Sequence, residues 1–174
     1  MNFTKMHGAG NDYIYVNAFE ESISDPVALA KKVSHRHYGV GGDGLILIKP
    51  HTSAAAEMEM YNADGSSSEM CGNGLRCVAK YVYDYKICKD TEFDLATGAG
   101  IKKVKVSKQE DGLATQITID MGAPILNGKE IPTTWESDVV VNQEISVLDQ
   151  TFQATCISMG NPHCVIYVDD VKNF

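Results

Sequence analysis

The sequence predicts an α/β (α+β) protein built from short strands and two helices. Apolar residues cover most of the circumference of a helix predicted over residues 74–85, so we expect sheet to bury this helix on several sides. Short apolar or alternating segments bounded by turn residues precede that helix. Beyond Cys88 the pattern is one of strands alone. Together these features indicate a sheet that packs against one apolar helix.

The first part of the chain opens with a predicted hairpin. Residues 3–16 have the pattern of two strands joined by a glycine turn. A helix is predicted to begin at Asp25, a good N-cap residue followed by proline, and to end at Gly39. Short strands are expected at 45–48 and 57–61.

Further strands follow the apolar helix. They are expected at 91–95, 101–107, 115–121, 139–141, 145–148, 152–158 and 165–168. Asp111-Gly112 is a typical two-residue hairpin turn. The turn-rich stretch 124–137 is a candidate boundary, and we divide the chain into domains 1–122 and 123–174.

Composition argues against several classes of partner. The 174 residues carry a formal net charge of −8 without a block of Lys or Arg, so nucleic acid and anionic membrane are poor partners. No segment approaches the roughly 20 apolar residues of a membrane span. The N-terminus lacks the apolar core of a signal peptide, and a cytoplasmic location is therefore expected.

The five cysteines show neither a Cys-x-x-Cys pair nor a Cys/His cluster at zinc spacing. An odd number of cysteines without an export signal fits free thiols in a reducing compartment. We therefore expect no metal site.

Cys71 stands where a loop of small residues meets the apolar helix. At a helix N-terminus, unpaired N–H groups and the positive end of the macrodipole favour a thiolate. The N–H groups of Gly72 and Asn73 could hold a substrate carboxylate there. The alternative is a buried structural cysteine, which is the commoner role for a lone cysteine.

The other polar motifs are weaker when each is taken alone. Asn11, in a glycine turn, is more typical of a left-handed turn residue than of a ligand. The loop 39–44 is rich in glycine but lacks the Gly-Lys-Ser/Thr ending of a phosphate-binding loop. His163 follows the turn at Asn161-Pro162, where a core hydrogen-bonding role and a site role are equally open.

Five motifs taken together resemble those of the diaminopimelate epimerases. They are HGAGNDY (7–13), GVGGDG (39–44), YNADG (61–65), MCGNGLRC (70–77) and MGNPHC (159–164), and they lie in the family's order along the whole chain. The resemblance implies a cofactor-independent enzyme of lysine and peptidoglycan-precursor synthesis that interconverts L,L- and meso-diaminopimelate. It makes a catalytic role for Cys71 the stronger interpretation.

The resemblance also implies roles for particular residues. In that family, one cysteine removes the substrate α-proton as a thiolate, and a second returns a proton to the opposite face. Cys71 matches the first, and His163 matches a histidine that tunes the protonation of the cysteines. Contacts to a small amino-acid substrate are implied for Asn11, Asn62, Gly72, Asn73 and Asn161.

The chain departs from the family pattern in three ways. Gly44 stands where the family often has a glutamine that contacts substrate. The glycine-rich motif of the second cysteine is missing, as is the Glu-Arg pair that binds the distal end of the substrate. We therefore interpret residues 1–122 as an epimerase domain with half of the site, followed by the opening strands of a truncated second domain, inactive alone.

Fold and assembly follow from the same resemblance. The family has two pseudo-symmetric domains, each a mostly antiparallel sheet wrapped around an apolar helix, with the active site in the cleft between them. Its last strand returns to the first domain, so here that edge would be open or covered in an oligomer, and a homodimer is one such assembly.

Other functions stay open from the sequence. A racemase of another amino acid would use the same first half, since the distal end of the substrate is read elsewhere. A non-catalytic binding or assembly fragment is a further alternative. A thiol-redox protein using Cys71 and Cys77 is disfavoured, because the two cysteines would point in different directions on the helix.

Overall fold

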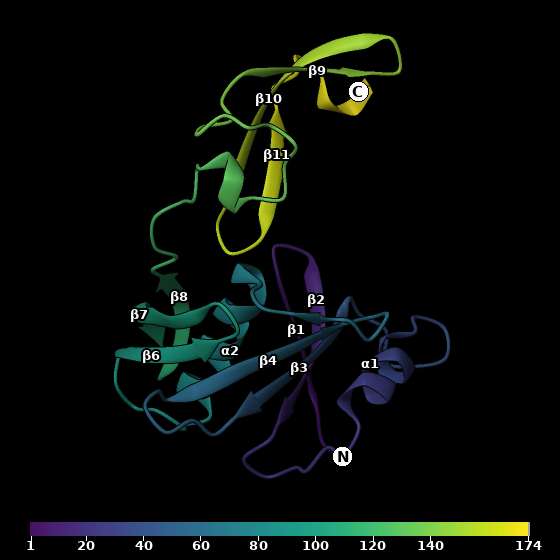
Figure 1. The fold of residues 1–174 in the computed structure, drawn as a ribbon. Helices are drawn as coiled ribbons and strands as arrows, with labels where there is room; N and C mark the ends of the chain where they lie inside the picture. The colour runs from purple at the N-terminus through teal and green to yellow at the C-terminus, as the bar shows by residue number, and fades with distance from the viewer. Residues whose placement is uncertain (174) are drawn as a thin grey trace. The chain divides into compact units, whose positions relative to one another are not determined.

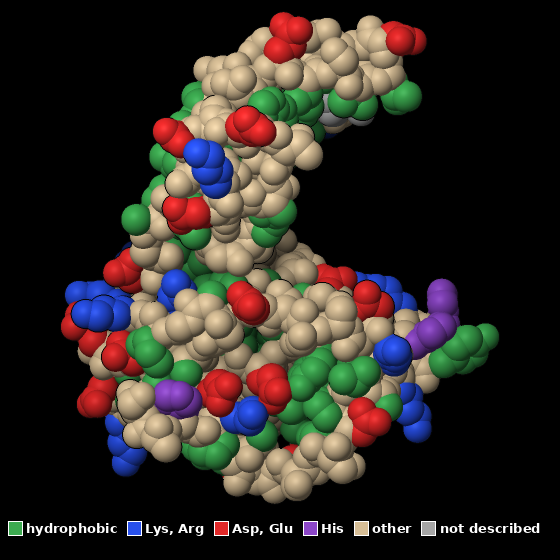
Figure 2. Space-filling view, in the orientation of Figure 1, with side chains coloured by type: hydrophobic (Ala, Val, Ile, Leu, Met, Phe, Trp, Pro, Cys, Tyr) green, Lys and Arg blue, Asp and Glu red, His purple; other side chains and the backbone are tan. Residues whose placement is uncertain are grey.

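The computed structural model describes residues 1–173 (Figure 1). The chain divides into two compact units, Met1–Met121 and Gly122–Phe174. The boundary predicted after residue 122 lies one residue from this division. No helix among the described residues is long and apolar enough to cross a membrane. On the face of the first unit that Figure 2 shows, acidic and basic side chains lie intermixed.

The first unit is one curled sheet with two helices. Its elements are β1 (Thr4–Gly8), β2 (Asn11–Asn17), α1 (Pro26–Ser34), β3 (Gly44–Lys49), β4 (Ala56–Asn62), β5 (Ser67–Ser68), α2 (Gly72–Asp84), β6 (Glu92–Thr97), β7 (Gly100–Glu110) and β8 (Leu113–Ile119). The strand order is β1-β2-β3-β4-β6-β7-β8, with β5 paired to β4. Two neighbouring pairs, β2/β3 and β4/β6, are parallel, and the others are antiparallel. The predicted fold class and its mostly antiparallel sheet are confirmed.

Helix α2 occupies the inside of the curl (Figure 1). Both end strands of the sheet, β1 and β8, contact it. Its buried side chains include Leu75, Val78 and Val82, each 0% exposed, and they pack against Tyr15 and Ile46 of the sheet. Apolar residues cover most of the circumference of this helix because the sheet packs against it on several sides.

Helix α1 covers the other face of the same central strands. Along β3, Ile46 and Ile48 belong to the core under α2, while Leu45 and Leu47 pack toward α1. This alternation follows from the two-residue period of a strand. It explains why the strand is a continuous apolar run.

The predicted end of α1 at Gly39 is wrong. The helix ends at Ser34, because His35 adopts an extended conformation with φ −62° and ψ 117°. The Nδ1 atom of His35 then accepts hydrogen bonds from the N–H groups of His37 and Tyr38, at 3.2 and 3.1 Å. The side chain of His35 thus closes a turn that follows the helix.

The second unit contains a three-stranded antiparallel sheet in the order β11-β10-β9. Its elements are η1 (Gly128–Glu130), β9 (Gln143–Val147), β10 (Gln150–Ser158), β11 (Pro162–Ile166) and η2 (Val171–Asn173). A small core of Ile131, Val140 and Cys156 holds it together.

Two strand predictions in the second unit need correction. Residues 139–141 form no strand, although the carbonyl oxygen of Val140 accepts a hydrogen bond from the Cys156 N–H at 2.9 Å. One such bond anchors the segment without making a ladder. The last strand begins at Pro162 and ends at Ile166, earlier than the predicted span 165–168, because its pairing with β10 starts directly after the turn.

Candidate active site

Cys71 is the N-cap residue of α2, with an extended backbone at φ −142° and ψ 106°. Its Sγ atom accepts a hydrogen bond from the Gly74 N–H at 3.3 Å. The thiol also donates to Oδ1 of Asn11, again at 3.3 Å. The half-buried sulfur therefore lies at the positive end of the helix with an amide side chain beside it.

Asn11 begins β2, and its side chain is fixed from the other side. Its Nδ2 donates to Oδ2 of Asp43 at 2.8 Å, and the Asp12 N–H donates to the same oxygen at 3.2 Å. Because one end of the amide is held by a carboxylate, the other end presents its oxygen to Cys71. The amide is thus oriented by its neighbours as well as by its backbone.

Arg36 joins two carboxylates of this network. One of its amino groups donates to Asp12 at 2.8 Å and to Asp43 at 2.9 Å, and Lys5 lies 3.1 Å from Asp12. The hydrogen bond from Arg36 lowers the pKa of Asp12 from 3.8 to about 2, with Lys5 adding to the effect. The Asp12 carboxylate therefore stays ionised well below neutral pH.

Asp43 and Arg36, which support Asn11, are not among the residues that the sequence motifs indicate as functional. Asp43 lies inside the glycine-rich motif 39–44, where the glycines alone suggested a function. Arg36 lies just beyond the end of α1, outside the five motifs. The sequence does contain one hint, because the acidic residues 12 and 43 are each adjacent to a glycine or an asparagine of a motif. The two residues are 31 positions apart, however, and no local sequence pattern shows that they come together.

Asn62 is placed at the same end of the sheet by strand register. It pairs with Gly44 of β3, which pairs in turn with Tyr13 of β2, two residues beyond Asn11. The Nδ2 atom of Asn62 donates to the Ser66 hydroxyl at 3.0 Å. The start of β2, the start of β3 and the end of β4 therefore bring two of the implied substrate contacts to one edge.

Gly72 and Asn73 form the first turn of α2, where N–H groups have no acceptor within the helix. No hydrogen bond from the described residues engages either of these two N–H groups. The side chain of Asn73 accepts from the guanidinium of Arg76. Two backbone donors next to the Cys71 sulfur are thus available to an anion.

Tyr13 and Tyr15 supply buried phenols behind this edge, 5% and 1% exposed. Burial raises the pKa of Tyr13 to about 12, and the nearby Cys71 contributes in the same direction. Burial also raises the pKa of Tyr15, with the Cys77 thiol as the next cause. Both hydroxyls therefore stay neutral at physiological pH.

Gly44 has no room for a side chain in this backbone. A Cβ atom there would lie 2.1 Å from the carbonyl oxygen of Tyr61 and 2.7 Å from the ring of Tyr13. The glutamine contact that the resemblance implies at this position is therefore absent from this chain.

Asn161 and His163 belong to the second unit. Asn161 lies in the short loop between β10 and β11, where its carbonyl oxygen accepts from the Met159 N–H at 3.1 Å. His163 lies on β11 opposite Ile157. Both side chains are exposed in the second unit, and their predicted roles stay predictions.

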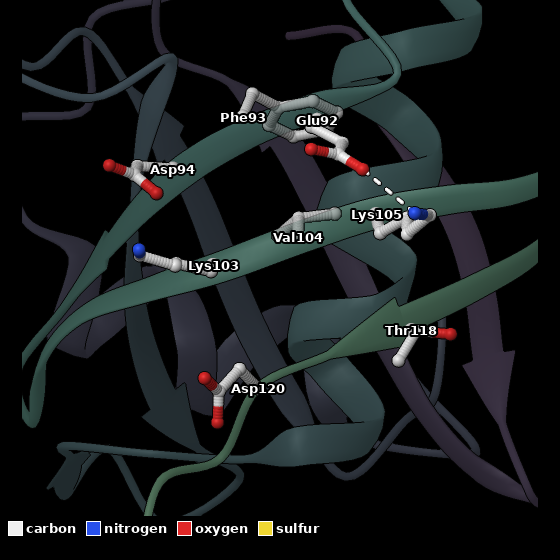
Figure 3. A pocket seen from close by; sticks show the side chains of 8 residues that line it. All are labelled: Glu92, Phe93, Asp94, Lys103, Val104, Lys105, Thr118 and Asp120. Atoms are coloured by element: carbon white, nitrogen blue, oxygen red, sulfur yellow. Dashed lines mark ion pairs between the residues drawn. The ribbon is translucent and has the colours of Figure 1, made fainter.

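The pocket in Figure 3 is a different place, on the strands β6, β7 and β8. It measures about 500 Å³, and its polar lining consists mainly of charged side chains of both signs. Glu92 and Lys105 form an ion pair across it at 2.8 Å. Its lining contains no thiol or histidine and no residue of the five motifs. Among residues 1–173, no three His, Cys, Asp or Glu side chains cluster as metal ligands.

Comparison with known proteins places this arrangement in a family. A model of the family described as diaminopimelate epimerase matches residues 3–126. The chain belongs to the diaminopimelate epimerase family. The resemblance stated from the five motifs is thereby confirmed.

Two epimerase relatives illustrate the extent of the match. The chain is 50% identical over 181 residues to the diaminopimelate epimerase of Agathobacter rectalis, covering 100% of this chain and 63% of that protein. It is 47% identical over 174 residues to that of Methanococcus maripaludis, covering 100% of this chain and 62% of that protein. The chain thus spans about 62% of the length of these curated relatives.

Solved structures share the fold of this epimerase-family chain at low sequence identity. A hydroxyproline epimerase from Agrobacterium vitis matches with a TM-score of 0.66 and 13% identity, covering 94% of this chain and 50% of that one. A PhzF-family phenazine biosynthesis protein from Bacillus anthracis matches with a TM-score of 0.62 and 17% identity, covering 99% and 58%. At such identities the likeness shows the fold alone.

Proposed function

We propose that this chain supplies half of the active site of a cofactor-independent amino-acid epimerase that interconverts L,L- and meso-diaminopimelate in lysine and peptidoglycan-precursor synthesis. One observation carries the proposal. The Cys71 sulfur stands at the N-terminus of α2, 3.3 Å from the amide oxygen of Asn11. Membership of the diaminopimelate epimerase family supports an amino-acid substrate for that thiol.

In this proposal Cys71, as a thiolate, removes the α-proton of the substrate. An amino-acid α-proton is far less acidic than a thiol, so the developing carbanion has to be stabilised by donors already in place. The N–H groups of Gly72 and Asn73 would bind the α-carboxylate, where charge develops. The amides of Asn11 and Asn62 would orient the amino-acid head.

We also propose Asn161 as a substrate contact and His163 as a residue that influences the protonation of the thiols. Inversion also requires a second acid on the opposite face of the α-carbon. The sequence contains no second cysteine in a glycine-rich motif of the family's type. We therefore expect the 174 residues alone to bind substrate without epimerising it.

Protection of Cys71 from alkylation tests the binding part of the proposal. Iodoacetamide labelling of each cysteine is followed by peptide mass spectrometry, with and without L,L-diaminopimelate. We expect the substrate to slow labelling of Cys71 and to leave Cys88, a half-exposed thiol elsewhere, unchanged. The matched control is 1,5-diaminopentane, which has the same two amines without carboxylates and should protect neither thiol.

If Cys71 is labelled equally fast with and without saturating diaminopimelate, or if the diamine protects it as well as diaminopimelate does, the substrate carboxylate is not bound by the N–H groups of Gly72 and Asn73.

A separate chiral assay tests whether two thiols are needed. Rapid appearance of meso-diaminopimelate with the purified 174-residue chain would show that one cysteine suffices and that the mechanism proposed here is wrong.

A further inference from the structure

Two cysteines of the second unit face each other across neighbouring strands. Cys156 of β10 is the direct register partner of Cys164 of β11. The N–H of Cys156 donates to the carbonyl oxygen of Val140 at 2.9 Å, and the N–H of Ser158 donates to the carbonyl oxygen of Ile125 at 3.0 Å. Neither acceptor belongs to β11, so the backbone N–H of Cys156 points away from that strand. The pair Cys156–Cys164 is therefore a non-hydrogen-bonded pair of the antiparallel ladder.

That kind of pair has the geometry of a disulfide. In non-hydrogen-bonded antiparallel pairs, the two Cα atoms lie about 4.5 Å apart and the side chains project from the same face of the sheet. Disulfides join Cα atoms separated by roughly 4.4 to 6.8 Å. Cys156 and Cys164 can thus be bridged with little backbone movement.

The two thiols differ in access. Cys156 is 5% exposed and packs with Ile131 and Val140, whereas Cys164 is exposed in the second unit. Burial raises the pKa of the Cys156 thiol, and the neighbouring Cys164 contributes in the same direction. A reagent from solution therefore meets Cys164 first, and Cys156 lies beside it on the same face of the sheet.

We propose that Cys156 and Cys164 form a cross-strand disulfide by exchange with a small-molecule disulfide such as oxidised glutathione. The Cys164 thiolate attacks one sulfur of the reagent, forms a mixed disulfide and releases one thiolate. Cys156 loses its proton to solvent, attacks the Cys164 sulfur and releases the second thiolate. Two protein thiols are oxidised and one reagent disulfide is reduced to two thiols.

No other cysteine pair in the described residues has this geometry. Cys71 and Cys77 lie on α2 six residues apart, which separates them by about 9 Å along the helix axis, beyond disulfide reach. Cys88 has no cysteine as a strand partner.

The bond would close the hairpin whose loop holds Asn161 and whose second strand holds His163. Its formation depends on the pairing of β10 with β11 alone. It does not require that either residue binds a substrate, so this proposal can fail or succeed independently of the proposed epimerase function.

Cyanogen bromide provides a direct test, because Met159 lies between the two cysteines and is the only methionine after Met121. The folded chain is incubated with oxidised glutathione, acidified, alkylated in denaturant and cleaved. We expect fragments 122–159 and 160–174 to remain joined, two hydrogen atoms lighter, and to separate on reduction.

Three variants sharpen the result. In Cys156→Ser, we expect fragment 160–174 to carry one glutathione, because the second exchange step has lost its thiol. In Cys164→Ser, we expect Cys156 to stay reduced, and in Cys88→Ser the joined product should form as in the parent. If Cys156→Ser does not fold, a fourth variant, Cys156→Ala, replaces it, and Trp135 fluorescence checks that the second unit is folded.

Fragments that separate without reduction after oxidation would overturn the proposal. Glutathione on both cysteines of the parent chain would do the same, since it would show that the two sulfurs do not reach each other.

Discussion

Replacing Cys71 by serine and by alanine separates its role as a helix cap from its chemistry. Serine is among the preferred N-cap residues, and its hydroxyl would accept the Gly74 N–H that the sulfur now accepts at 3.3 Å. Alanine leaves that N–H without a side-chain acceptor. We expect the serine variant to be at least as stable as the parent chain and the alanine variant to be less stable, while both lose alkylation at position 71.

The magnitude follows from the contacts that are lost. Exchange of a serine N-cap for alanine costs about 1 kcal/mol, within a range of roughly 0.5 to 2. Alanine also removes the donor to Asn11 Oδ1, but that oxygen can turn to water at this half-buried place, so the addition is small. The free energies of unfolding of the serine and alanine variants should therefore differ by about 1 kcal/mol.

Urea unfolding followed by far-UV circular dichroism measures this difference, because both α-helices lie in the first unit. Fluorescence of Trp135, the only tryptophan, reports on the second unit and serves as the internal control. A serine variant less stable than the alanine variant, or an equal effect of both, would show that the sulfur does not cap α2.

Three further substitutions test the packing and charge network. Gly44→Ala should lower the free energy of unfolding by roughly 3 kcal/mol in urea titration, since the new Cβ would lie 2.1 Å from the Tyr61 oxygen; an unchanged midpoint would contradict the close contact. Asp12 has a pKa of about 2 in the folded state against 3.8 ordinarily, so its contribution is present above about pH 4 and lost as the pH falls toward 2. Arg36→Gln should therefore lower the free energy of unfolding at pH 6 and change it little at pH 2, and a loss independent of pH would argue against the ion pair. Leu75→Ala, at a 0% exposed position, should cost roughly 2 to 5 kcal/mol in the same titration, and a loss below 1 kcal/mol would place α2 outside the core.

The elements that the sequence predicted well carry local signals. The apolar circumference of α2 shows in the residue types alone, and the turn at Asp111-Gly112 uses two left-handed residues, with φ 51° and 78°. The predicted N-cap of α1 is also confirmed, because the Asp25 side chain accepts a hydrogen bond from the Ala28 N–H at 2.9 Å. The position of Asp25 before a proline indicates this role in the sequence. In each case the cause lies within a few residues of the effect.

What the sequence did not yield depends on distant pairing. The parallel neighbours β2/β3 and β4/β6 could not be told from antiparallel ones by strand pattern. The support of Asn11 by Asp43 spans 32 positions and exists only after β2 and β3 pair. The alignment of Cys156 with Cys164 required the strand register, which shifts every side chain when it moves by one residue.

Two glycines of the motifs have a packing role that the sequence pattern does not show. In the sequence the motif glycines suggest turns or a phosphate loop, yet these two are sites of close packing around α2. A Cβ at Gly8 would lie 2.8 Å from the Asn73 oxygen, and a Cβ at Gly74 would lie 2.8 Å from the Ile46 side chain. The helix N-terminus can therefore approach both β1 and β3, and this approach brings the Cys71 sulfur to the amide of Asn11. A larger residue at either glycine should weaken that contact before it unfolds the chain.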